Sequence, residues 1–236
     1  MSFSLRSSLV AVAGMLVLSA GALAQTAPAT TTTTTTTTMT APTPAPISYK
    51  LDNSAGAIYV QVYKDPTTLA ASLSHDHIIV SKGWSGSVTW DPTNPGACKV
   101  DITVPVNQLD NDNVDWRKKV GYDTVLDDGD RAEVKEHMLE EDQLNAAKYP
   151  TISFKATKCE GSGTAIKVTG DFTLRGVTKS ISVPMTISAT DTAITAKGSF
   201  KVNQSSFGFQ PYSALLGQLK NKDEMSFTID VKGNKS

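Results

Sequence analysis

The sequence contains few cysteines, almost no net charge and no apolar run beyond its N-terminus that approaches the length of a membrane span. Its 22 basic residues against 23 acidic ones give a net charge of −1, so it lacks the basic excess typical of proteins that bind nucleic acid or anionic membrane surfaces. It also lacks a phosphate-binding glycine loop, a Cys-x-x-Cys pair and a nucleophile-elbow pattern. We therefore expect neither an enzyme nor a nucleic-acid-binding protein.

The first 24 residues have the pattern of a secretory signal peptide. Arg6 precedes the apolar run Leu9–Leu18, and the small-x-small phrase Ala22–Ala24 precedes Gln25. The apolar run is too short to span a bilayer. We expect the protein to be exported, with no stable membrane span.

Residues 25–46 are mainly threonine, proline and alanine, including a long threonine run. Such a segment cannot bury enough apolar surface to offset the entropy lost on ordering, which predicts a disordered tether. A glycosylated or wall-associated stalk is the alternative, and both interpretations stay open.

Alternation of apolar and polar residues predicts antiparallel strands in the remaining residues, 47–236. Thr151–Thr157, Ala165–Arg175 and Ser180–Ala189 place apolar side chains at nearly every second position, which is typical of a sheet with one buried and one solvated face. Ser48–Asp52 and Ala57–Tyr63 are predicted to form a hairpin. No linker interrupts residues 47–236, so a single domain is expected.

Between residues 110 and 147 the alternation stops, which predicts a short helical excursion between strands. Helices are expected around Val114–Val125 and Arg131–Leu139. No amphipathic helix is large enough to cover an open sheet, so the roughly eight strands are expected to close on themselves. The predicted fold is all-β, an eight-stranded antiparallel barrel. Its many small interior residues favour a cavity over a filled core.

The two cysteines of an exported chain predict one disulfide. Cys98 precedes the strand Val100–Val104, and Cys159 follows the strand Ile152–Ala156. If these strands pair antiparallel, the start of one lies beside the end of the other. A Cys98–Cys159 bridge is therefore expected.

A cluster of histidines contains side chains that could bind a metal ion or a ligand. In an extended segment His75 and His77 point to the same face with Asp76 opposite, and His137 is a third candidate nitrogen ligand. A metal site, contact with the head group of a ligand and structural hydrogen bonding are the three interpretations. The sequence leaves all three open, and no metal ligands are assigned.

Four phrases stand out within this pattern: His137–Leu139, Lys148–Lys155, Gly170–Lys179 and Ser205–Gly208. Together with their spacing they resemble the YceI-like family of bacterial periplasmic proteins that bind polyisoprenoids or other lipids. The most specific phrase is the Leu-Arg-Gly-Val-Thr-Lys run after an alternating strand. The resemblance covers essentially all of residues 47–232.

The resemblance implies a lipocalin-like barrel at residues 47–236, located in the periplasm, with a long apolar pocket. We predict a carrier that holds a polyisoprenoid, an isoprenoid quinone or a fatty acyl chain and requires no cofactor. A homodimer through an exposed sheet edge is the expected form if the protein associates. The alternative function is a metal-binding or stress-related enzyme built on His75 and His77. The predicted ligand-binding residues are His75, His77, Trp84, Trp90, His137, Phe154, Phe172, Phe200, Phe207 and Phe227.

Overall fold

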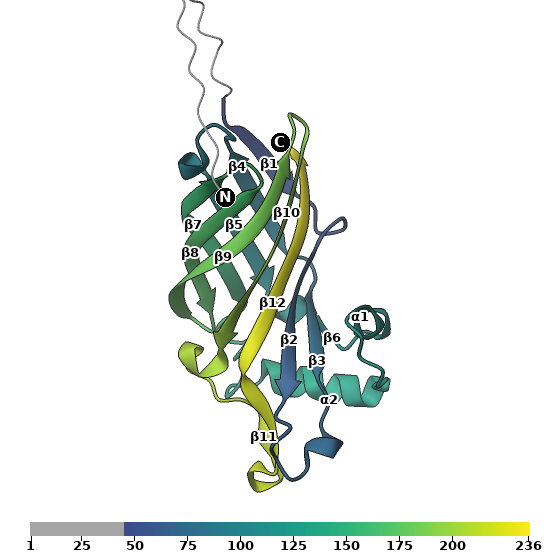
Figure 1. The fold of residues 1–236 in the computed structure, drawn as a ribbon. Helices are drawn as coiled ribbons and strands as arrows, with labels where there is room; N and C mark the ends of the chain where they lie inside the picture. The colour runs from purple at the N-terminus through teal and green to yellow at the C-terminus, as the bar shows by residue number, and fades with distance from the viewer. Residues whose placement is uncertain (1–44) are drawn as a thin grey trace, which may run out of the picture. The chain divides into compact units, whose positions relative to one another are not determined.

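Eight antiparallel strands close into a barrel in the computed structural model, which describes residues 45–236 (Figure 1). The strands follow the order β1-β4-β5-β7-β8-β9-β10-β12, and pairing of β12 with β1 closes the ring. The predicted all-β, eight-stranded fold is confirmed. The ring consists of β1 (Ile47–Leu51), β4 (Ser85–Trp90), β5 (Lys99–Pro105), β7 (Thr151–Ser162), β8 (Ala165–Leu174), β9 (Val177–Ala189), β10 (Ala193–Asn203) and β12 (Leu219–Lys235).

The predicted signal peptide lies outside the described residues, as does the predicted tether up to residue 44. Within residues 45–236, no helix combines the length and the apolar character needed to cross a membrane.

Strand β12 is longer than the ring requires, and its excess length carries a second group of strands. Its last residues pair with β1, and residues nearer its middle pair with β2 (Ala57–Lys64). β1 and β2 therefore follow one another along β12 without pairing, and the predicted hairpin is wrong. Gly56 allows this passage, because a Cβ there would lie 2.9 Å from the Asp230 carbonyl oxygen. β2 then pairs with β3 (His77–Ser81), and β3 pairs with β6 (Leu109–Asn111).

Two α-helices follow β6. α1 (Val114–Lys119) stops well short of the predicted end, and Gly121 just beyond it has a left-handed φ of 80°. α2 (Asp128–Leu139) matches its prediction and begins at Asp127, whose side chain accepts from the Asp130 amide. Short elements complete the chain: β11 (Ser213–Ala214) and the 3₁₀ turns Ala71–Leu73, Pro95–Ala97, Val106–Gln108, Gln204–Phe207 and Leu215–Gly217.

Arg131 fixes α2 against β6, and so positions α2 at the end of the barrel where β2 and β3 project (Figure 1). Its backbone carbonyl accepts from Asn111 Nδ2 at 2.9 Å, and its Nε donates to the Asn111 carbonyl at 3.1 Å. Its Nη2 lies 3.1 Å from Asp110 Oδ1. α2 consequently forms part of the wall around the barrel interior.

A disulfide joins Cys98 and Cys159, as the strand pairing predicts. β5 and β7 pair antiparallel, with Asp101 opposite Lys155, so the start of β5 lies beside the far part of β7. Cys159 is buried within the larger core cluster.

The turn between β8 and β9 contains the Leu-Arg-Gly-Val-Thr-Lys run, the most specific of the phrases identified in the sequence. Arg175 and Gly176 both have positive φ, 50° and 71°, as in the two-residue turns that match strand twist. The Arg175 guanidinium donates to the Gly208 carbonyl at 2.5 Å and to the Glu141 carbonyl at 2.8 Å. One arginine therefore ties the hairpin to two loops that are distant in sequence.

Candidate functional site

The barrel contains an apolar cavity of about 300 Å³, at the small end of the usual range for ligand pockets. β12 lines it over much of its length through alternate side chains from Met225 to Val231. Around Val231 the neighbouring wall is entirely apolar, and the residues there are Leu51, Val88, Val168, Val183, Ile187 and Ile194. One end of the cavity is therefore suited to a hydrocarbon chain.

Polar side chains concentrate at the opposite end, which we call the polar end. It is formed by the start of β3, by α2 and the loop after it, and by the chain from the Gln204–Phe207 turn to the start of β12. Its polar lining residues are His77, Glu133, His137, Gln143, Gln204, Tyr212 and Asn221. The cavity thus has a dry end and an end that can pair with a polar group.

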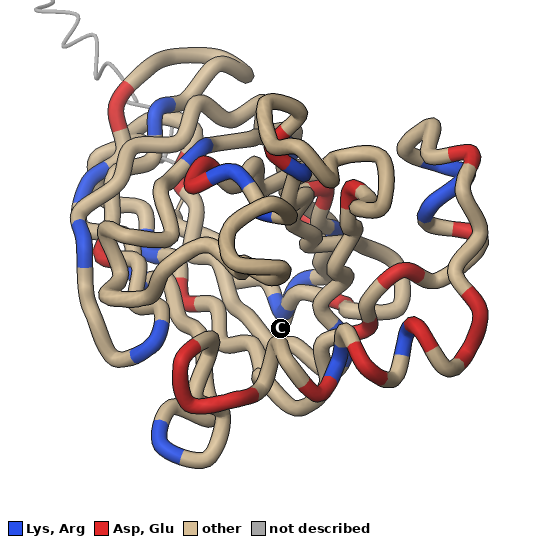
Figure 2. Tube along the Cα trace, turned by 90° about the horizontal axis from the view of Figure 1, so that it is seen from below, with Lys and Arg blue, Asp and Glu red and all other residues tan. Residues whose placement is uncertain are grey.

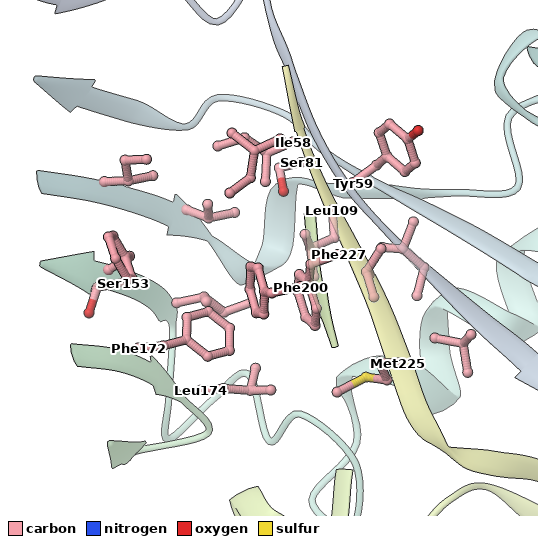
Figure 3. Close-up of a pocket in the computed structure, with 18 of the residues that line it drawn as sticks. Ile58, Tyr59, Ser81, Leu109, Ser153, Phe172, Leu174, Phe200, Met225 and Phe227 are labelled. Carbon is pink, nitrogen blue, oxygen red and sulfur yellow. The ribbon is translucent and has the colours of Figure 1, made fainter. Parts of the chain in front are cut away.

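Three phenylalanines meet between the two ends (Figure 3). The rings of Phe200 and Phe227 are stacked, with centroids 4.8 Å apart, and Phe172 lies edge-on to both at 5.5 Å. Phe200 and Phe227 come from the paired strands β10 and β12, and Phe172 comes from β8, which is separated from β10 by β9. Figure 3 shows the three rings pointing toward one another, so they narrow the cavity at this level.

His77 is held by a buried ion network at the polar end. Its Nδ1 lies 2.7 Å from Asp112 Oδ2, and Arg117 Nη1 lies 2.6 Å from Asp112 Oδ1. The Ile78 amide also donates to Asp112 Oδ1 at 3.1 Å. Asp112 is fully buried and has a left-handed φ of 53°, which is uncommon for a residue with a side chain.

The network sets the protonation of Asp112 and thereby the orientation of the His77 ring. Burial raises the pKa of the Asp112 carboxyl, but the hydrogen bonds from His77, Ile78 and Arg117 outweigh burial and hold the pKa below its usual value. A carboxylate accepts only, so Nδ1 of His77 donates to it. In the neutral ring Nε2 is then an acceptor, on a residue that lines the cavity.

His137 on α2 has a different environment. Its Nδ1 lies 3.3 Å from Glu140 Oε2, and its Nε2 lies 3.6 Å from Glu133 Oε1. The hydrogen bond to Glu140, with a smaller contribution from Glu133, raises the pKa of His137. Its ring also lies 5.4 Å from that of Tyr212. His137 is therefore protonated more readily than a free imidazole.

The structure brings six of the predicted ligand-binding residues into the lining of the cavity and leaves four outside it. Trp84 and Trp90 pack in the core cluster with Tyr49, and Phe207 lies edge-on to Phe172 outside the lining. His75 precedes β3, and burial lowers its pKa. The six lining residues are His77, His137, Phe154, Phe172, Phe200 and Phe227.

The metal interpretation finds no support in the geometry of the histidines. Nδ1 of His77 is engaged by Asp112, and His137 pairs with Glu140 and Glu133. In residues 45–236 no group of three His, Cys, Asp or Glu side chains is arranged to hold a metal ion.

Sequence reasoning missed Asp112, Arg117 and most of the polar end. Asp112 is 35 positions from His77, in a stretch with no strand alternation to place it. Glu133 and Gln143 lie in or after a helix, and Tyr212 lies in a loop. No periodic signal marks such residues, because their position depends on how loops fold back on the barrel.

An eight-stranded antiparallel barrel with a cavity that is apolar at one end and polar at the other belongs to the lipocalin-like class, whose interior holds one small ligand. Within that class the chain belongs to the YceI-like family, because the family model of the YceI-like domain matches residues 49–233. The family resemblance seen in the sequence is confirmed.

Curated relatives match over part of their length. Protein YceI of Escherichia coli O157:H7 is 32% identical over 102 residues, which are 43% of this chain and 44% of that protein. A UPF0312 protein of Pseudomonas aeruginosa (strain LESB58) is 32% identical over 100 residues, 42% of this chain and 43% of that protein. The chain thus aligns with less than half the length of these relatives.

Solved structures share the fold at low sequence identity. Burkholderia cenocepacia BcnA matches with a TM-score of 0.59 and 17% identity, over 77% of this chain and 98% of BcnA. A polyisoprenoid binding domain from Saccharophagus degradans, implicated in plant cell wall breakdown, matches with a TM-score of 0.54 and 12% identity, over 80% of this chain and 99% of that domain. These matches show a common barrel.

Proposed function

We propose that this protein is a periplasmic carrier that holds a long apolar lipid in its barrel cavity. The observation that carries the proposal is the cavity itself, with an apolar end around Val231 and a polar end around His77 and His137. Each methylene buried in such a cavity contributes about 0.8 kcal/mol, offset by the ordering of the chain. The proposed ligands are a polyisoprenoid, an isoprenoid quinone or a fatty acyl chain.

Family membership and one structural neighbour support the choice of lipid. The domain from Saccharophagus degradans is described as polyisoprenoid binding, and it shares the barrel architecture. Branched isoprenoid chains are apolar along their length, like the wall formed by Leu51, Val183 and Ile187.

The head group of the ligand is proposed to lie at the polar end. In its neutral form His77 supplies a ring whose Nε2 accepts a hydrogen bond, and His137 supplies an imidazole whose pKa is raised by Glu140 and Glu133. A hydroxyl suits the first. His137 already pairs with Glu140 and Glu133, so it contributes to the polarity of this end together with those carboxylates. The role is binding, and no step of catalysis is proposed for either histidine.

Native mass spectrometry of the protein isolated from its own cells, followed by organic extraction, tests the proposal. We expect a stoichiometric apolar adduct of several hundred daltons that organic solvent releases. An empty protein that also fails to take up a long-chain polyprenol, a quinone or a fatty acid would overturn the proposal. A zinc-sized increment that is lost in His75→Ala would favour the metal-binding alternative.

Periplasmic location is the second part of the proposal, and it depends on the first 24 residues. N-terminal sequencing of the protein from a periplasmic fraction is expected to begin at Gln25. A chain that still begins at Met1 in the cytoplasmic fraction would contradict export.

A further inference from the structure

Exposed large apolar side chains are concentrated on two loops. Five such side chains are exposed in residues 45–236, and four of them lie in the loop before β3 or the loop after β11. Single exposed leucines are ordinary on protein surfaces, but a cluster indicates an interaction site. The cluster, which we call the leucine tip, consists of Leu69, Leu73, Leu215 and Leu216.

Backbone hydrogen bonds hold the two loops together. The Ala70 amide donates to the Gln218 carbonyl at 2.8 Å, and the Asp65 amide donates to the Lys220 carbonyl at 2.7 Å. Figure 1 shows the two loops side by side at the lower end of the view, the blue segment leading to β3 and the yellow one beyond β11. The two loops that carry the leucines therefore lie side by side although they are about 140 positions apart in the chain.

The backbone of the second loop is strained at its two leucines. Leu215 and Leu216 both have left-handed φ values, 51° and 57°, and Leu216 is fully exposed. Two adjacent residues with large side chains in this conformation are unfavourable by roughly 1–2 kcal/mol each. Glycine or asparagine would adopt this conformation at lower cost.

The leucine tip adjoins the polar end of the cavity. Tyr212 and Asn221 line the cavity, and the Asn221 amide donates to the Tyr212 carbonyl at 3.0 Å. Leu215 follows Tyr212 by three residues, at most about 10 Å of extended chain.

Charge is distributed unevenly around this end of the barrel. Lys220 and Lys222 are exposed beside the tip and Lys64 is half-buried there, whereas Asp65 and Asp76 are the acids on the same loop. Acidic residues collect instead along α2 and the chain around it, on the right of Figure 2. Their positions are Asp123, Asp127, Asp128, Asp130, Glu133, Glu136, Glu140, Glu141 and Asp142. The tip therefore has a small excess of lysine over acid and lacks the acidic excess of α2.

We propose that the leucine tip docks on a lipid bilayer, with its leucines in the interfacial region and Lys220 and Lys222 near the head groups. Apolar side chains flanked by cations are the combination that binds membrane interfaces, and each basic residue adds attraction to anionic lipid. Docking by the tip brings the polar end of the cavity to the membrane surface, where a lipid ligand would enter or leave.

Vesicle sedimentation tests the docking. The protein in its proposed exported form, beginning at Gln25, and its Leu215→Ser/Leu216→Ser variant are mixed with vesicles of phosphatidylethanolamine and phosphatidylglycerol. We expect the variant to bind roughly tenfold more weakly or worse. Lys220→Gln/Lys222→Gln should bind more weakly to these vesicles but equally to vesicles of phosphatidylcholine. Every variant has the same N-terminal segment, so its contribution to binding is constant.

Val125→Ser is the matched control, because Val125 is the fifth exposed large apolar side chain within residues 45–236 and lies between α1 and α2. It should bind as the unchanged protein does. Equal binding by the leucine variant would overturn the proposal, as would an absence of binding by the unchanged protein. The proposal would also be overturned if the unchanged protein were a dimer in solution and the leucine variant a monomer, because the tip would then bind a second copy of the chain. Vesicle binding is measured without ligand, so its failure leaves the proposed carrier function standing.

Discussion

At the scale of single residues, Asp112 is the group whose chemistry is most constrained. It is fully buried and accepts from His77, Arg117 and the Ile78 amide. Removing one partner of a buried ion pair is costly because the other charge is left uncompensated. The same carboxylate orients a histidine of the cavity, so stability and binding depend on one side chain.

Asp112→Asn is expected to destabilise the fold by about 3–5 kcal/mol, since Arg117 would be left as an unpaired buried cation. Urea unfolding measures the change. Asp128→Asn is the control, because Asp128 is fully exposed at its contact with Arg131 and should matter by less than about 0.5 kcal/mol. Equal effects of the two substitutions would contradict the importance of the buried network.

The same network predicts a loss of stability in acid. The pKa of Asp112 is lower in the folded state than its usual value of 3.8. Its contribution is therefore complete above pH 3.8 and is lost as the pH falls through the lower, folded pKa. In the Asn variant the acid unfolding curve should be flatter in this range.

The contribution of His137 to stability depends on pH in the opposite direction to that of Asp112. Its pKa is raised above 6.5, so its interactions with Glu140 and Glu133 stabilise the fold below pH 6.5 and are lost as the pH rises through the folded pKa. Glu140→Gln should lower the pKa of His137, as measured by NMR. Glu136→Gln, an exposed acid on the same helix, should change it little. A larger shift in the control would refute the assignment to Glu140.

At the scale of elements, the hairpin turn and the disulfide connect parts of the chain that the strand ladder alone leaves separate. Arg175 ties the β8–β9 turn to the loops at Glu141 and Gly208, and those loops border Gln143 and Phe209 in the cavity lining. The Leu-Arg-Gly run is thus a motif that positions the polar end of the cavity.

Arg175→Asn removes the guanidinium contacts but keeps the turn, because Asn-Gly is favoured in two-residue turns with positive φ. Amide hydrogen exchange is expected to become faster around Glu141 and Gly208 while the amides of β8 and β9 stay protected. Lys179→Ala, an exposed residue of the same hairpin, is the control. Unchanged exchange in both loops would show that the arginine contacts are dispensable.

The disulfide closes a loop with a sequence separation of 61 residues. Loop-closure entropy in the unfolded chain gives a stabilisation of about 4 kcal/mol for this length. Cys98→Ser/Cys159→Ser should lose about this much in urea unfolding, and reductant should not affect it further. An unchanged midpoint for the unmodified protein in reductant would contradict the expectation.

At the scale of the whole molecule, the cavity exists because a closed ring of strands leaves its centre to side chains. Small residues such as Ala196 do not fill that centre. The length of β12 then adds β2, β3 and β6 outside the ring, and α2 completes the wall. This added part supplies His77, Glu133 and His137 to the polar end of the cavity.

Ala196→Phe is expected to place a ring in the cavity and to abolish the lipid adduct seen by native mass spectrometry. Ser199→Phe on the outer face of the same strand should keep the adduct, because Ser199 is exposed. Near-ultraviolet circular dichroism verifies that both variants fold. Retention of the adduct by a folded Ala196→Phe protein would place the lipid elsewhere.

The sequence by itself determined the barrel, its apolar interior and the pairing of Cys98 with Cys159. These follow from the two-residue period of strands, which fixes the face of each side chain without reference to the rest of the chain. The positions of Phe172, Phe200 and Phe227 in the cavity lining agree with that rule.

Only the tertiary structure decided the separation of β1 from β2, the burial of Trp84 and Trp90 outside the cavity, and the assembly of its polar end. The pairing of Asp112 with His77 and the convergence of the leucine tip also appear only there. Each depends on contacts between segments that have no common period. Such contacts are set by how the closed sheet and its loops fold back on one another, and a local pattern carries no information about that arrangement.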